Sequence, residues 1–481
     1  MASHVTLTGQ SNKPYVPTSR YEEDPVYALL TIDPTQAPEA PPQSGPRPQL
    51  NLVIVVDASA TMYNFQLSPT EREYWLSLAL SRNEMERGTA DERDAVYWSG
   101  QTLQEMQAIV RKPMTLAVQA IKQVMTRLNA SDNLAVIAFA DQTYTVFTQN
   151  DWKSRPDYCR MALDDLLDQR YPYEIGTGTR MTAALQQAAH DLGAGTELGV
   201  VDRIIVLSDG IVQDRRETVT AIETIRERNH AVSTIGVGDE FDEEFLMRLA
   251  DISRGQYYYA ATSDAIADNM MAELSAIQST ALQQVYIQVN GQSGAMVQDV
   301  YMVSPSMTIF DEMEAGDSVL RARVGDLPGD RVTQLLIQIA PALQPMGEHP
   351  LADVTLTWQE IDESGNMSGE RSAHVQLEQG YSDDPALLAD RNAVVQEYAD
   401  RFKVYKYERE AQRFQERGNL TAAREKLGAA TRELHKLGET ELAGELEAQI
   451  AELNAGYADP SRIKRIKATT RKLGEKITPQ G

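Results

Sequence analysis

Cysteine is nearly absent from this chain. Cys159 is the single cysteine among 481 residues, so no intramolecular disulfide can form. Secreted binding modules usually carry several such bonds, and their absence favours a reducing compartment. The N-terminal stretch MASHVTLTGQ has neither the basic segment nor the apolar segment of a signal peptide. We therefore expect a cytoplasmic protein.

Long apolar runs and an excess of positive charge are also missing. No run of roughly 18 apolar residues occurs, the length that a membrane-spanning helix needs. The chain has 45 Lys and Arg against 70 Asp and Glu, for a formal net charge of −25. Nucleic-acid binding depends on cations that neutralise phosphates. We expect neither a nucleic-acid partner nor a membrane span.

Strands and helices alternate between residues 49 and 278. Leu52–Val56 is a continuous apolar run, typical of a strand buried on both faces of a parallel sheet. Leu116–Leu128 has apolar residues at helical spacing, and Leu134–Phe139 and Ile204–Leu207 are further apolar strands. This alternation predicts an α/β domain with a doubly wound, mostly parallel, Rossmann-like sheet.

Residues 279–382 have a different pattern, in which short strands are separated by Gly, Pro and Asp turns. That pattern predicts an antiparallel β-sandwich. Residues 1–48 contain one predicted strand, Val26–Ile32, and a linker with six prolines, Pro34–Pro48, which should be extended. Because the linker separates this strand from the α/β domain, we expect the strand to join the sandwich. The α/β domain would then be an insertion into the sandwich.

The end of the chain is predicted to be helical. Residues 383–456 are rich in Leu, Ala, Glu, Lys and Arg, and GNLTAAREKLGAATRELHKLG resembles half of a tetratricopeptide-like hairpin. One such unit cannot form a solenoid, so we expect it to pack on the body or on a partner. Residues 457–481 form a basic tail. We interpret it as a solvated, frayed helix, with a docking arm for an acidic surface as the alternative.

Three polar loops are expected at the carboxyl ends of strands, where ligands bind in open parallel sheets. The first runs from Asp57 to Met62, the second from Gly176 to Met181, and the third from Leu207 to Gly210. Together they supply two carboxylates and three hydroxyls, from Asp57, Ser59, Thr61, Thr179 and Asp209. Mg²⁺ prefers six oxygen ligands, some of them water. The loops therefore predict a site for Mg²⁺, or for Mn²⁺ or Ca²⁺.

The same residues resemble the metal-ion-dependent adhesion site of the von Willebrand factor A family, in its bacterial type. The family pattern is Asp-x-Ser-x-Ser, then a Thr, then an Asp. Asp57 and Ser59 match it, Thr61 replaces the second Ser, and Thr179 and Asp209 take the last two positions. Threonine keeps the hydroxyl but is stiffer at χ1, so we expect binding with altered affinity. The stretch IGVGDEFDEEFLMRLADISRGQYYYA is also similar, and the resemblance covers about residues 50–275.

The resemblance implies a scaffold for protein–protein interaction rather than an enzyme, with no catalytic residues. In the family the hydroxyls are direct metal ligands, the Asp residues often act through water, and an Asp or Glu of the partner completes the metal shell. Two alternatives stay open. One is an adaptor for a ring-forming AAA+ ATPase of the chelatase or chaperone kind. The other is a phosphotransferase, because Asp-x-x-x-Thr is similar to the Asp-x-Asp-x-Thr of haloacid dehalogenase-like phosphatases, although Ser59 lacks their acid/base carboxyl.

An insert of about 50 residues, 63–111, separates the first loop from the first helix of the α/β domain. Glu71–Leu80 and Thr102–Val110 are predicted to be helical. Because the insert leaves from the first loop, it must lie near the metal face. It is either a cap with a small aromatic core of its own, or a lid or partner-reading surface.

Overall fold

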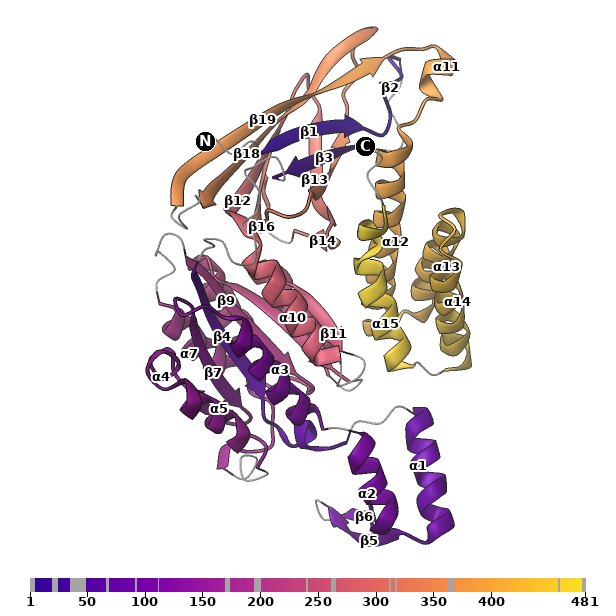
Figure 1. Ribbon diagram of the computed structural model, residues 1–481. Helices are drawn as coiled ribbons and strands as arrows, with labels where there is room; N and C mark the ends of the chain where they lie inside the picture. Colours follow the sequence, from indigo (N-terminus) through magenta and orange to yellow (C-terminus); the bar gives the residue numbers. More distant parts are fainter. Residues whose placement is uncertain are drawn as a thin grey trace.

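The computed structural model describes residues 5–19, 25–34, 49–65, 69–90, 93–110, 112–168, 174–193, 200–238, 241–260, 265–310, 313–315, 318–361, 367–456 and 459–477. The predicted linker lies outside these ranges after Pro34. Figure 1 shows a β-sandwich above an α/β domain, with a helical module beside both and a small insert projecting below. None of the helices in the described part of the chain combines the length and apolar character that crossing a bilayer requires.

The α/β domain is built on a six-stranded sheet in the order β11-β10-β9-β4-β7-β8. All neighbouring strands are parallel except the edge strand β8, which is antiparallel to β7. This agrees with the doubly wound, mostly parallel sheet expected from the alternating pattern. The strands are β4 (Gln49–Asp57), β7 (Asn133–Phe139), β8 (Thr143–Phe147), β9 (Val200–Ser208), β10 (Ala231–Val237) and β11 (Tyr257–Ala260).

Helices cover both faces of this sheet because its central strands are apolar on both sides. Along β4, Leu52 and Ile54 belong to the core on one face, whereas Val53 and Val55 belong to the core on the other. The first face is covered by α3 (Pro113–Arg127), α5 (Pro156–Asp165) and α10 (Ala265–Gln278), and the second by α7 (Thr182–Leu192), α8 (Arg215–Glu227) and α9 (Glu243–Ser253). The short helix α4 (Gln149–Ser154) follows β8.

The sandwich contains a five-stranded sheet, β1-β3-β17-β13-β14, and a six-stranded sheet, β15-β16-β12-β18-β19-β2. Strand β3 lies between β1 and β17, with Leu30 opposite Leu335. The chain therefore enters the α/β domain after a strand of one sheet and returns through β12 of the other. The strands are β1 (Thr6–Ser11), β2 (Tyr15–Val16), β3 (Val26–Asp33), β12 (Thr280–Gly291), β13 (Met296–Ser304), β14 (Thr308–Ile309), β15 (Met313–Ala315), β16 (Val319–Pro328), β17 (Thr333–Ala340), β18 (Gly347–Ile361) and β19 (Met367–Tyr381).

The C-terminal helices pack on the body of the molecule. Tyr398, Phe402 and Tyr405 of the long helix α12 share a core with the sandwich, and the rings of Tyr301 and Phe402 lie 4.1 Å apart. The tetratricopeptide-like stretch Gly418–Gly438 corresponds to α13 and its flanking turns. The helices are α11 (Pro385–Leu388), α12 (Ala393–Glu416), α13 (Leu420–Lys436), α14 (Thr440–Ala455), α15 (Pro460–Arg471) and the 3₁₀ helix η2 (Leu473–Lys476).

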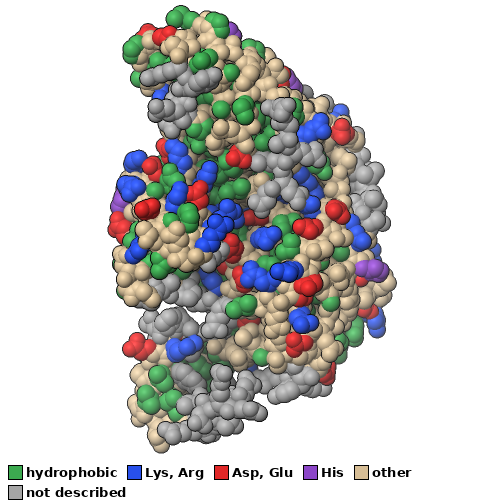
Figure 2. All heavy atoms as spheres, turned by 180° about the vertical axis from the view of Figure 1, so that it is seen from behind, with side chains coloured by type: hydrophobic (Ala, Val, Ile, Leu, Met, Phe, Trp, Pro, Cys, Tyr) green, Lys and Arg blue, Asp and Glu red, His purple; other side chains and the backbone are tan. Residues whose placement is uncertain are grey.

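The prediction of a solvated, frayed basic tail is wrong for the described residues 459–477. They form α15 and η2, and Lys464, Lys467 and Arg471 are buried. Lys467 pairs with Glu243 at 3.1 Å, and Arg471 pairs with Asp251 at 2.7 Å, so α15 docks on α9. Figure 2 shows other Lys and Arg side chains on the surface of one face of the molecule, with acidic side chains among them. The acidic partners lie more than 200 residues earlier in the sequence, where local charge patterning cannot reveal them.

The insert folds on itself. It contains α1 (Pro69–Arg82), the hairpin β5 (Met85–Ala90) and β6 (Arg93–Trp98), and α2 (Gly100–Ile109). Both expected helices are present, whereas the hairpin was not predicted. Trp75 and Met106 are buried, and the Glu84 carboxylate accepts hydrogen bonds from the first amides of α2, those of Gln101 and Thr102, at 3.0 and 2.7 Å. In Figure 1 this unit projects away from the sheet beyond the end of β4.

Candidate metal centre

The first and third predicted loops begin side by side. Strands β4 and β9 are parallel neighbours in which Val56 lies opposite Leu207. Asp57 and Ser208 therefore end adjacent strands at the same edge of the sheet. This edge faces the insert and lies opposite the sandwich (Figure 1).

Asp57 is fully buried at the end of β4. One of its carboxylate oxygens accepts a hydrogen bond from the Ser59 amide at 2.9 Å, and the other accepts one from the Ser208 hydroxyl at 2.6 Å. Burial raises the pKa of the Asp57 carboxyl above its usual range, while the hydrogen bonds from Ser208 and Ser59 lower it. Asp57 thus holds the first loop in shape and adds a buried acid behind it.

The hydroxyls of the first loop form a short chain that ends on the third loop. Ser59 Oγ lies 3.0 Å from Thr61 Oγ1, and Thr61 Oγ1 donates to Asp209 Oδ1 at 2.7 Å. The 3₁₀ turn η1 (Ala60–Tyr63) carries Thr61, which is exposed, whereas Ser59 and Asp209 are buried. Four of the five predicted residues therefore meet through direct hydrogen bonds.

Thr179 reaches the same place because the third loop has a glycine. A Cβ atom at Gly210 would lie only 2.6 Å from Thr179 Oγ1, so the second loop can approach this closely only with glycine there. The Gln213 amide donates to the Thr179 carbonyl oxygen at 2.9 Å, which ties the two loops together. The structure thus brings all five predicted residues to one edge of the sheet.

Two further aspartates shape the second loop and were not assigned from the sequence. Asp141 accepts hydrogen bonds from the amides of Thr177 and Gly178 at 3.0 and 3.1 Å, and Asp214 accepts from those of Met181 and Thr182, each at 3.0 Å. Asp141 follows β7, so the rule that polar residues gather at strand ends could have found it. Asp214 carries no such signal, because it precedes α8 and acts on the start of α7.

The five predicted residues of the centre offer only oxygen atoms as metal ligands. Its side chains supply three hydroxyls and two carboxylates, from Ser59, Thr61, Thr179, Asp57 and Asp209. Within the described ranges, no three His, Cys, Asp or Glu side chains gather in a way suited to a metal ion. An oxygen set with few carboxylates matches hard divalent cations rather than metals that prefer nitrogen or sulfur.

The insert begins and ends beside this centre. Tyr63, the last residue of η1, donates from its hydroxyl to the carbonyl of Leu166 at 2.9 Å. Where the chain returns, Lys112 Nζ lies 5.4 Å from the centre of the Phe65 ring. The two chain segments that connect the insert to the α/β domain therefore lie close together, next to the first loop.

Two family models match the chain. Residues 107–273 match the von Willebrand factor type A domain, and residues 393–476 match the Sll0103-like, C-terminal alpha-helical domain. The first match begins within the insert, so strand β4 and the loop from Asp57 precede it. The structure places that strand between β9 and β7 at the centre of the sheet.

Similar proteins are known at low sequence identity. The uncharacterized protein YfbK of Escherichia coli (strain K12) is 24% identical over 181 residues, which are 37% of this chain and 30% of that protein. The chain thus matches less than a third of that relative's length. A solved von Willebrand factor type A structure from Catenulispora acidiphila is 16% identical with a TM-score of 0.70, and the superposition covers 98% of this chain and 97% of that one.

A further solved structure is similar over part of the chain. Proximal thread matrix protein 1 from the mussel byssus, solved with zinc in its MIDAS motif, is 18% identical with a TM-score of 0.32 over 48% of this chain and 46% of that one. The full-length likeness to the Catenulispora structure shows the fold of all three modules, and the family models name two of them. The chain contains a von Willebrand factor type A (VWA) domain, joined to a strand-rich region and to a C-terminal alpha-helical domain of the Sll0103-like type.

Proposed function

We propose that the chain binds a protein partner through a divalent cation held by Asp57, Ser59, Thr61, Thr179 and Asp209. The observation that carries the proposal is the hydrogen-bonded chain from Ser59 through Thr61 to Asp209, with Thr179 beside Gly210. VWA domains commonly mediate metal-dependent protein interactions, and they are generally not catalytic.

The residues fit a cation of the Mg²⁺ kind, with Mn²⁺ and Ca²⁺ as substitutes. The hydroxyls of Ser59, Thr61 and Thr179 would hold the ion, and Asp209 and Asp57 would balance its charge directly or through water. The bound ion would supply a positive charge that attracts an Asp or Glu carboxylate of the partner. Because Thr61 is exposed, a partner can reach this edge. The single cysteine agrees with a cytoplasmic setting for this binding.

The phosphotransferase alternative has less support. An attacking aspartate must reach the phosphorus atom, but Asp57 is 0% exposed and both its oxygens accept hydrogen bonds. An adaptor for a ring-forming ATPase would need a surface that docks the ring, and a free basic tail could supply one. Since α15 is docked on α9, that argument no longer favours it.

The proposal is tested by removing the metal and its ligands separately. We expect partners recovered from a lysate by the wild-type chain to be lost with a chelator and lost with Asp57→Ala plus Asp209→Ala. Isothermal titration with Mg²⁺ and Mn²⁺ measures the ion directly. Thr61→Val replaces the hydroxyl that contacts Ser59 and Asp209 by a methyl group. It should weaken binding of the ion by about tenfold or more, the range seen for altered metal shells.

Asp157→Ala is the matched control, because the Asp157 side chain is 97% exposed and lies on α5 of the same domain. It should bind the ion and the partners as the wild type does. Recovery of the same partners with chelator and with the double variant would show that binding does not depend on the metal.

The insert is predicted to select the partner. It presents apolar side chains to solvent, with Tyr74, Leu80 and Ile109 exposed by 59%, 63% and 72%. Deleting Phe65–Gln107 with a short linker should change the set of proteins recovered, while circular dichroism shows the sheet still folded. Tyr74→Ser plus Leu80→Ser, which leaves the buried Trp75 in place, should reproduce part of the change. An unchanged set of partners in both variants would make the insert a structural cap.

A further inference from the structure

A cavity of about 820 Å³ lies where the three modules meet. Its walls come from β11 and α10 of the VWA domain, from the sandwich around Ser306 and Asp326, and from α15 and η2 of the helical domain. Small-molecule sites commonly occupy cavities of about 300–1,000 Å³ at domain junctions. The size and place of this cavity are therefore those of a ligand site, distant from the sheet edge that carries Asp57.

The wall of the cavity is cationic, although the whole chain has a net charge of −25. Three carboxylates line it, from Glu273, Asp326 and Glu475. The cationic side chains outnumber them: Arg203, Arg254, Arg331, Arg471 and Lys472. In a strongly acidic protein this local reversal of sign favours an anionic ligand.

Two of the three carboxylates already have protein partners. Glu273 accepts hydrogen bonds from the hydroxyls of Ser233 and Tyr258 at 2.5 and 2.9 Å. Asp326 accepts one from the amide of Gln284 at 3.1 Å. Both acids are thus held in place by the protein, and both also lie at ion-pair distance from Arg203.

The two buried arginines of the wall are incompletely paired. Arg471 donates to Asp251 at 2.7 Å, but its Nε and Nη1 atoms have no hydrogen-bond partner among the described residues. Arg203 lies 3.9 Å from Glu273 and 3.5 Å from Asp326, and its Nε atom also has none among them. A guanidinium offers five donors, and leaving buried donors unpaired is costly. Both guanidinium groups thus keep hydrogen-bond donors that the described protein atoms do not use.

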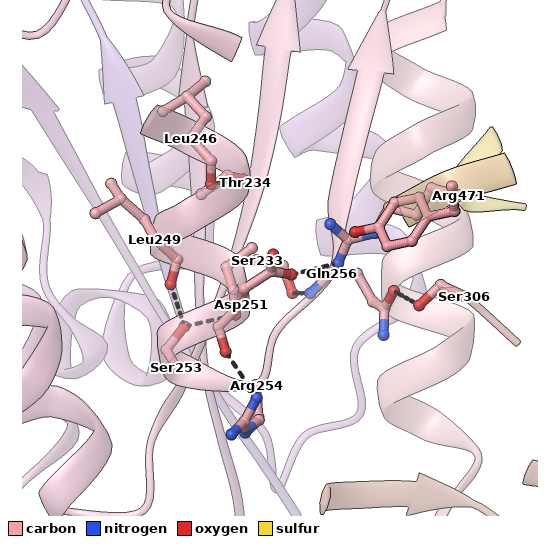
Figure 3. Close-up of polar contacts among 12 residues, drawn as sticks. Ser233, Thr234, Leu246, Leu249, Asp251, Ser253, Arg254, Gln256, Ser306 and Arg471 are labelled. Carbon is pink, nitrogen blue, oxygen red and sulfur yellow. Dashed lines mark hydrogen bonds and ion pairs between the residues drawn. The ribbon is translucent and has the colours of Figure 1, made fainter. Parts of the chain in front are cut away.

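Gln256 connects the cavity wall formed by the VWA domain to the wall formed by the sandwich. Its backbone amide donates to Ser233 Oγ at 3.0 Å, and its side-chain oxygen accepts from Ser306 Oγ at 3.2 Å. Figure 3 shows Gln256 between Arg254 and Arg471, with its side chain directed at Ser306. The side-chain oxygen is used in this contact, so the side-chain nitrogen remains as a donor beside the arginines.

We propose that this cavity binds a small organic anion that carries phosphate or carboxylate groups. Arginine guanidinium groups pair with both kinds of anion through parallel hydrogen bonds. Arg331 and Lys472, which are exposed, would attract the ligand at the rim. Because the ligand would touch all three modules, its binding would also hold them in this arrangement.

The test uses the full chain and three probes at equal ionic strength: inorganic phosphate, adenosine monophosphate and citrate, with NaCl as the reference. We expect at least one organic probe to raise Tm with saturation and to give a Kd below about 1 mM by calorimetry. Arg331→Gln plus Lys472→Gln removes two exposed rim charges without touching the buried arginines. This variant should bind the probe at least about tenfold more weakly, as expected for lost charge-assisted hydrogen bonds.

Arg321→Gln plus Lys436→Gln is the control, since it removes two charges outside the cavity lining. It should bind as the wild type does. A response to adenosine monophosphate alone would identify a phosphate ligand, and a response to citrate alone a carboxylate ligand. Equal Tm shifts in both variants, shifts no larger than those from NaCl, or no shift at all would overturn the proposal.

Discussion

Replacing Asp251 by alanine is expected to destabilise the docking of α15 by about 3–5 kcal/mol, the usual cost of removing one partner of a buried ion pair. Asp251 is 3% exposed and pairs with Arg471 at 2.7 Å and with Arg409 at 3.4 Å. Its removal leaves two guanidinium groups at the contact between α9 and the helical domain without their shared carboxylate. Hydrogen exchange should show faster opening of residues 460–471, and urea should unfold the variant at a lower concentration.

Two comparisons separate charge burial from general damage. Asp157→Ala breaks an exposed pair with Arg160, and exposed pairs contribute about 0–1 kcal/mol, so it should change little. Asp251→Leu combined with Arg471→Met replaces the pair by apolar side chains and should recover part of the loss. Protection of residues 460–471 equal to that of the wild type in Asp251→Ala would show that the ion pairs do not hold α15 in place.

Glu408→Gln is expected to stabilise the chain at pH 8 and to have little effect at pH 5. Glu408 lies on α12, is 4% exposed, and burial raises its pKa from 4.5 to about 7. Glu243 and Glu244 of α9 also raise this pKa, whereas Lys467 of α15 and the neighbouring Arg409 lower it. The folded chain thus holds this proton more tightly than the unfolded chain does.

The direction of the pH effect follows from that difference. Stability associated with Glu408 is fully present below pH 4.5 and is lost as the pH rises to about 7. At about 1.4 kcal/mol per pH unit, the loss is at most about 3 kcal/mol. Urea midpoints of the wild type and the variant at pH 5 and pH 8 measure it. Glu425→Gln, at an exposed position on α13, is the control. A gain from Glu408→Gln that is equal at both pH values would contradict a titrating Glu408.

Most of the candidate centre could be predicted because it depends on local order along the chain. Strand β4 is recognisable as an apolar run, and its parallel alignment with β9 brings Asp57 and Ser208 to one edge. The approach of Thr179 to Gly210 could not be predicted, because it depends on how two loops distant in sequence pack. Asp214 was not predicted for the same reason, because it precedes α8 and shapes the second loop, which is distant in sequence.

The basic C-terminus is the clearest failure of prediction from local sequence. Seven Lys and Arg between residues 461 and 477 suggest a solvated helix, because isolated charges prefer water. Folding supplies Glu243 and Asp251 as buried partners, and the segment becomes part of an interface. Similarly, the pairing of β3 with β17 joins residues about 300 positions apart, which the sequence suggested only through the order of elements.

Local patterning along the chain determined the kinds of elements and the residue types at the strand ends, since strand and helix periodicity and loop chemistry act over a few residues. Together with the resemblance to the von Willebrand factor A family, this patterning was sufficient to predict the doubly wound sheet and to name a candidate set, Asp57, Ser59, Thr61, Thr179 and Asp209. Tertiary structure alone decided which charges are buried, how the insert projects, and where three modules enclose a cationic cavity. These features depend on desolvation and pairing between distant segments, whose energies arise only when the segments meet.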